Sequence, residues 1–101
     1  MINVQNSASL KIDEIYRYTL KTWGEEQAKS YVNDLFESFN NIGNSLVVSY
    51  PIPADFGING FYFRYEKHFI YWKYLNSGDI GIVTILHERT HQIKQFFTDL
   101  I

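Results

Sequence analysis

The chain has 101 residues, of which 46% are hydrophobic and 18% aromatic, with a formal net charge of −2 and no cysteine. This composition excludes an intrinsically disordered chain, a disulfide scaffold and a thiolate metal site. The slight negative charge disfavours broad contact with a nucleic-acid backbone, so we expect no sequence-specific nucleic-acid partner. The length predicts a single domain over residues 1–101.

Targeting signals are missing from the sequence pattern. The start, Met1–Asn6, lacks the basic flank and apolar stretch of a signal peptide. The longest apolar run, Ile80–Leu86, is interrupted by Gly81 and Thr84 and is too short to cross a bilayer. We therefore expect a soluble cytoplasmic protein that has no membrane partner.

The first third of the chain predicts a short strand and a helical hairpin. Residues 1–5 alternate as a strand would, and Ser7 or Ser9 is expected to cap a helix that ends at Gly24. Its apolar residues recur near helical spacing and are expected to pack, with Trp23 as a lid: Ile12, Ile15, Tyr16, Leu20 and Trp23. A second helix follows at once, which predicts an antiparallel pair. Its expected buried stripe is Ala28, Tyr31, Val32, Leu35, Phe36 and Phe39.

The remaining chain predicts a loop, a sheet and a final helix. Residues 40–59 contain several turn formers and are expected to form a loop. Strands are expected at 61–65, 68–75 and 80–86, because these segments are rich in β-forming residues. A last amphipathic helix is expected to place these residues in the core or at a dimer surface: Ile93, Phe96, Phe97, Leu100 and Ile101. The predicted fold class is α+β, with a helical hairpin packed on a small, mostly antiparallel sheet.

The segment His87-Glu88-Arg89-Thr90-His91 matches the zinc pattern H-E-x-x-H. On a helix, this spacing places two imidazoles on one face to hold zinc, with the glutamate as general base. Here the pattern follows a predicted strand, and Arg89 places a cation between the ligands. Asp99 is the sole downstream acidic candidate ligand, and His68 lies upstream, where a structural role is expected. We therefore expect no metal or other cofactor, and a small zinc protease is a remote alternative.

Four segments together carry a family resemblance. They are Asp13-Glu14-Ile15 with Tyr18-Thr19, Trp23–Ala28, His68–Lys73 and Ile82–His91. In order and spacing they resemble the ParE/RelE superfamily of bacterial toxins from type II toxin–antitoxin systems, on the ParE side. The chain departs from the family pattern where Thr84 stands for the usual strand arginine and Thr90-His91 for the usual Met-Asp.

The resemblance implies a growth-inhibiting toxin that binds a cellular target, typically DNA gyrase, and is neutralised by a cognate antitoxin. Such a protein is more a binder than an enzyme. The candidate target- or antitoxin-binding residues are Arg64, Lys73, His87 and Arg89. The alternative is a RelE-like, ribosome-dependent messenger RNA endoribonuclease, in which Lys73 and Arg89 offset phosphate charge and His87 or His91 carries a proton. A third reading is a degenerate member that keeps the fold and antitoxin binding alone.

Overall fold

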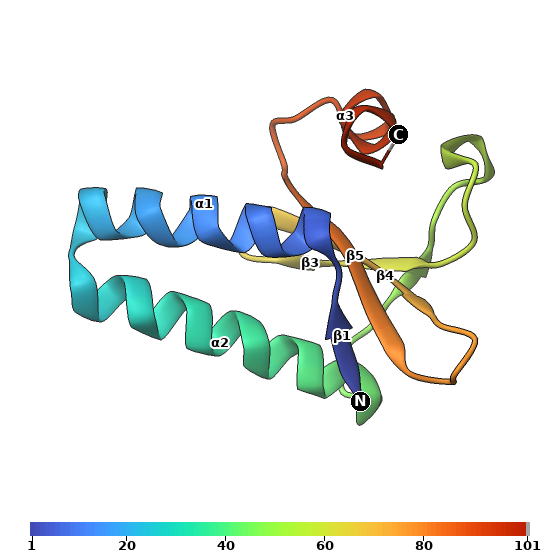
Figure 1. Cartoon of the computed structure of the whole chain (residues 1–101), viewed down its shortest axis with the longest axis horizontal. Coiled ribbons are helices and arrows are strands. Elements are labelled where there is room, and N and C mark those ends of the chain that lie inside the picture. Colours follow the sequence, from blue (N-terminus) through green and yellow to red (C-terminus); the bar gives the residue numbers. More distant parts are fainter. Residues whose placement is uncertain (101) are drawn as a thin grey trace.

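The computed structural model describes residues 1–100, without the side chain of Leu100. Three helices and a five-stranded sheet give the predicted α+β architecture. The hairpin of α1 and α2 extends to one side of the molecule (Figure 1). None of the helices among residues 1–100 has the length and apolar character needed to span a bilayer.

The helical hairpin consists of α1 (Asn6–Trp23) and α2 (Glu25–Gly43), which Gly24 alone separates. Gly24 has a φ of +98°, a region that favours glycine, and this conformation lets the chain reverse within one residue. The closed end of the hairpin extends away from the strands (Figure 1). That end is therefore open to solvent, whereas the opposite end packs on the sheet.

The sheet has the strand order β1-β5-β4-β3-β2, in which β1 and β5 are parallel and every other pair is antiparallel. Its strands are β1 (Ile2–Val4), β2 (Tyr50–Pro51), β3 (Phe61–Tyr65), β4 (His68–Tyr74) and β5 (Ile80–His87). The turn between β3 and β4 forms without glycine, because Glu66 itself adopts a positive φ of 54°. The register places His68 directly opposite His87 at the end of the sheet.

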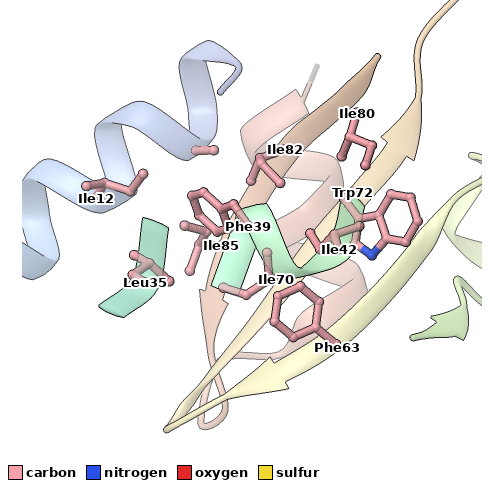
Figure 2. Packing of buried hydrophobic residues seen from close by; sticks show 11 residues of the cluster. Ile12, Leu35, Phe39, Ile42, Phe63, Ile70, Trp72, Ile80, Ile82 and Ile85 are labelled. Atoms are coloured by element: carbon pink, nitrogen blue, oxygen red, sulfur yellow. The ribbon is translucent and has the colours of Figure 1, made fainter. Parts of the chain in front are cut away.

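One face of the sheet packs against the hairpin. Phe39, Leu35 and Ile70 are almost completely buried there, and Figure 2 shows their side chains gathered with those of the central strands. The other members of this cluster are Ala8, Ile12, Ile42, Phe63, Trp72, Ile80, Ile82 and Ile85. Burial of each large side chain contributes about 1.5–3 kcal/mol, so this layer fixes the hairpin on the strands.

The opposite face packs against α3 (Gln92–Leu100) and a short 3-10 helix, Ala54–Phe56. Phe96 is 2% exposed and packs edge-on against the ring of Tyr71, with ring centroids 5.2 Å apart. Tyr71 also donates a hydrogen bond of 2.8 Å to Gln92. An ion pair of 3.3 Å between Lys11 and Asp99 then joins α3 to α1.

The hairpin shows where amphipathic spacing was misleading. The helix α1 begins at Asn6, so neither Ser7 nor Ser9 caps it, and Ser7 instead shares a 2.8 Å hydrogen bond with Thr84. Trp23 was expected to pack as a lid, but it is 64% exposed, and Leu20 and Phe36 are more than 40% exposed. The predictions for Leu20 and Trp23 were wrong because the projecting end of the hairpin has no sheet beneath it (Figure 1). Phe36 follows the buried Leu35 on α2 and packs edge-on against Phe39, with ring centroids 5.4 Å apart.

Other differences lie in the loop and the last helix. The segment predicted as loop, 40–59, contains the end of α2, the two-residue strand β2 and the 3-10 helix. In the last helix Phe96 is buried and Phe97 is 40% exposed. The predicted burial of Leu100 and Ile101 lies outside the described side chains. His91 precedes α3 and is exposed.

Candidate functional site

A cleft of about 640 Å³ lies between the projecting half of the hairpin and the end of the sheet that carries the β3–β4 turn. One wall comes from the hairpin and the other from this turn and the end of β5. The lining residues are Glu14, Ile15, Tyr18, Thr19, Trp23, Tyr31, Glu66, Lys67, His68, His87, Glu88 and Arg89. A smaller cleft of about 240 Å³ adjoins it toward α3, and both are lined by Glu14, Ile15, His68 and His87.

Two histidines form the floor between the two clefts. The rings of His68 and His87 meet edge-on, with centroids 5.2 Å apart, and the hydroxyl of Tyr31 lies 3.1 Å from Nδ1 of His68. Burial, followed by the nearby His87, lowers the pKa of His68 to about 4, and Glu88 opposes this change in part. His68 is therefore neutral at physiological pH.

Tyr31 joins the hairpin to this end of the sheet. Its ring packs edge-on against Tyr65 at 5.7 Å between centroids. Burial, with smaller effects from Tyr65 and Glu66, raises the pKa of the Tyr31 hydroxyl to about 12. The neutral hydroxyl and the neutral imidazole of His68 therefore meet without a formal charge, which suits a partly buried contact.

The predicted site residues fall into two groups. His87 and Arg89 line the large cleft, and Arg64 is bonded to its rim through Glu88, with Nη2 at 2.5 and 3.3 Å from the two carboxylate oxygens. Lys73 lies apart, in another cleft lined by residues such as Gly60 and Tyr74. Lys73 comes five positions after His68 along β4, a path of roughly 17 Å at about 3.3 Å per residue.

The geometry of residues 87–91 does not suit zinc. His87 closes β5, residues 88–90 form a turn, and His91 precedes α3, so the two imidazoles do not share a helical face. Nδ1 of His87 accepts a hydrogen bond from the Arg89 backbone N–H at 3.1 Å, and Nδ1 of His91 accepts one from Lys94 at 3.4 Å. Both lone pairs are therefore directed at backbone donors rather than at a common metal position. No cluster of three or more acidic or histidine side chains among the described residues is arranged to hold a metal.

Several cleft residues were not predicted from the sequence. Glu14, Tyr18 and Trp23 form the hairpin wall, and Tyr31 reaches the floor. Tyr18 and Trp23 belong to segments that carry the family resemblance, yet spacing alone suggested that Trp23 packs in the hairpin. A helical stripe that continues beyond the sheet is the signal that locates such residues, and it requires the strand boundaries first.

A family model described as the ParE toxin of the type II toxin–antitoxin system parDE matches residues 2–91. The chain belongs to the ParE toxin family. No curated protein matches it. The matched region contains every residue that lines the large cleft and ends before α3.

Membership in this family makes the chain a toxin of a type II toxin–antitoxin system, whose partner is an antitoxin. The position at which the family resemblance expects a strand arginine is occupied by Thr84, which is completely buried. Its hydroxyl is paired with Ser7 at the start of α1. This ParE toxin therefore uses that position for packing β5 against α1 rather than for presenting a cation.

Proposed function

We propose that this toxin inhibits growth as a binding protein, that DNA gyrase is its target, and that a cognate antitoxin neutralises it. The observation that supports this most is the charge balance of the large cleft. Arg64 already pairs with Glu88. The lining also contains two cations, Lys67 and Arg89, and two further carboxylates, Glu14 and Glu66, so these opposite charges are equal in number.

A ribonuclease needs a different arrangement. Cleavage of RNA places extra negative charge on a phosphate in the transition state, and converging donors or cations must offset it. The alternative assigned this role to Lys73 and Arg89 together, with His87 or His91 as the proton carrier. Lys73 lines a separate cleft, and His91 is outside the lining of the large one. The charge balance therefore favours binding of a protein surface over binding of RNA.

Gyrase as the target rests on the family resemblance, and the cleft supports the mode of action. A protein target needs an exposed surface with apolar anchors and satisfied polar groups rather than a set of catalytic groups. Tyr18 and Trp23 supply exposed aromatic surface on one wall. Inhibition of gyrase would take place in the cytoplasm, which is where we expect the protein.

Expression in a bacterial host tests this proposal. We expect expression of the chain alone to stop growth, with DNA replication stalled and messenger RNA intact. Co-expression of the protein encoded by the neighbouring reading frame should restore growth, and the two proteins should copurify. If that neighbouring product neither binds nor protects, the proposed antitoxin pairing is wrong. Rapid loss of messenger RNA before replication stops would instead favour the ribonuclease.

A further inference from the structure

Two turns lie side by side at the end of the sheet that borders the large cleft. The β3–β4 turn precedes His68, and the turn of residues 88–90 follows His87. The register pairs His68 with His87, so the two turns leave the sheet next to each other. The backbone N–H of Glu88 donates a 2.8 Å hydrogen bond to the carbonyl of Lys67. This bond continues the pairing of β4 with β5 one residue past the strand ends.

The side chain of Arg64 bonds to both turns. Its Nε donates a 2.9 Å hydrogen bond to the carbonyl of Glu66 in the β3–β4 turn. Its Nη2 lies 2.5 and 3.3 Å from the two carboxylate oxygens of Glu88 in the other turn. Several donors held in one plane suit such a double contact, which the single ammonium of a lysine cannot reproduce. One guanidinium therefore fastens the two turns to each other.

Arg64 itself lies outside the cleft that its partner lines. Glu88 lines the large cleft together with His87 and Arg89, whereas Arg64 is not part of the lining. The Nε and Nη2 donors of Arg64 are already directed at the two turns. The groups that this wall presents to the cleft are therefore those of residues 87–89, and Arg64 affects them through Glu88.

The positions of His87 and Arg89 depend on the turn that Arg64 holds. The backbone N–H of Arg89 donates to Nδ1 of His87 at 3.1 Å, and the backbone N–H of Thr90 donates to the His87 carbonyl at 2.9 Å. These bonds join the imidazole and the backbone of the turn into one unit. A shift of Glu88 would therefore move the start of the Arg89 side chain and alter the bond that orients the His87 ring.

We propose that Arg64 is a positioning residue, which fixes the turn of residues 88–90 through Glu88 and thereby orients His87 and Arg89 toward the cellular target of the toxin. It acts without a contact of its own to that target. The assignment rests on the proposed function, because it takes growth inhibition through this wall as the effect that Arg64 supports. The two side chains are 57% and 26% exposed, and an ion pair at such exposure adds little to the stability of the whole fold. Its loss should therefore loosen the turn and leave the fold intact.

Growth inhibition by three variants tests the proposal. Arg64→Met and Glu88→Met each remove one end of the ion pair and keep a side chain of similar length, and the third variant combines both changes. The measured quantity is the level of toxin at which expression stops growth. We expect each single variant to need about threefold more toxin or higher. The double variant should need no more than either single variant, because the two changes remove the same interaction.

Amide hydrogen exchange gives a second readout that depends on no target. The amide of residue 88 should lose protection several-fold in Arg64→Met and in Glu88→Met, since its bond to Lys67 lies between the fastened turns. The amide of Ile85, an almost fully buried residue of β5, should keep its wild-type protection. An equal loss at both amides would show a weakened sheet in place of a loosened turn and would overturn the proposal.

Two control variants separate this ion pair from general effects of surface charge. Lys29→Met breaks an exposed 2.8 Å ion pair with Glu25 on α2. Arg17→Ala removes an exposed arginine of α1 that lies outside the cleft lining. Both variants should keep the growth inhibition of the wild type and its protection of the Glu88 amide.

The outcomes distinguish the positioning role from the proposed function. If the wild-type chain does not stop growth, the proposed function fails, and the exchange measurement still decides whether Arg64 holds the turn. A loss of toxicity in Arg64→Met with full toxicity in Glu88→Met would show that Arg64 contacts the target itself and would overturn the assignment. Losses that add in the double variant would also overturn it, since they would show two separate contacts.

Discussion

At the scale of single residues, His68 shows how burial sets a charge state. Its ring lies against His87 and within hydrogen-bonding distance of Tyr31, and its pKa falls to about 4 from the ordinary value of 6.5. Between these two pH values the unfolded chain binds a proton at this histidine and the folded chain does not. Stability must therefore decrease as the pH falls from about 6.5 toward 4.

Replacement of His68 by glutamine tests this linkage. We expect the wild-type free energy of unfolding to drop by on the order of 1–2 kcal/mol more than that of His68→Gln across this interval, since solvent reaches part of the ring. Urea titrations at several pH values between 4 and 7 measure the difference. His91→Gln, at an exposed position, should keep the wild-type slope. Equal slopes for the wild type and His68→Gln would show that the imidazole is not held neutral.

The H-E-x-x-H segment gives a second residue-scale prediction. The Nδ1 atoms of His87 and His91 both accept backbone hydrogen bonds, and the segment is a strand end followed by a turn. We expect elemental analysis of the purified protein to find no stoichiometric zinc, with no change in His91→Ala. If the wild-type protein contained one zinc per chain and His91→Ala lost it, the result would support the zinc-protease alternative instead.

A sequence pattern such as H-E-x-x-H does not by itself decide which secondary structure carries its residues. The letters of residues 87–91 drew attention to a segment whose His87 and Arg89 line the large cleft. The pattern could not show whether a helix or a strand carries them, and that choice changes their chemistry. The bond from Arg64 to Glu88 joins residues 24 apart in the sequence, so it was invisible until the strand register placed β3 and β5 across β4.

At the scale of elements, the entry into β3 depends on a close approach of two backbones. A Cβ at Gly60 would lie 2.7 Å from the carbonyl oxygen of Trp72 and 3.1 Å from Cδ1 of Ile52. The amide of Ile52 also bonds to the Gly60 carbonyl at 2.9 Å. The local chain cannot shift to relieve the contact without loosening β2 against β3.

Gly60→Ala should therefore lower the free energy of unfolding by about 2–3 kcal/mol, as overpacking against backbone does. Gly43→Ala is the matched control, because Gly43 ends α2 and a Cβ there would meet only Cδ1 of Ile80, at 3.9 Å. Alanine should raise stability at that helical position by about 0.5–1 kcal/mol. Thermal or urea unfolding of both variants provides the measurement, and a Gly60→Ala chain as stable as the wild type would contradict the packing.

The elements differ in how far the sequence could predict them. Strong apolar spacing placed the hairpin, and β-forming residues placed the strands from Phe61 onward to within one residue of their ends. The two-residue strand β2 has no sequence pattern of its own, since it exists by pairing with Phe61 and Tyr62. The exposure of Trp23 also depends on tertiary structure, because the same stripe is buried where the sheet lies beneath it.

At the scale of the whole molecule, the sheet order determines the site. β5 lies between β1 and β4, so its end carries His87 to a position between the hairpin and the β3–β4 turn. The parallel pairing of β1 with β5 was not predicted, because no local pattern distinguishes it from an antiparallel edge. Apolar spacing and β-forming residues predicted the fold class, and the family resemblance drew attention to the end of β5, whereas the separation of Lys73 from Arg89 required the register.

Inhibition of purified DNA gyrase tests the central claim most directly. The chain should block supercoiling by gyrase, and Arg89→Ala should need about tenfold more protein for the same inhibition, as loss of an interface cation requires. Arg17→Ala should act like the wild type, and messenger RNA on purified ribosomes should stay intact. Uninhibited gyrase together with rapid, ribosome-dependent cleavage of messenger RNA, abolished by Lys73→Ala or Arg89→Ala, would contradict the account and identify a ribonuclease.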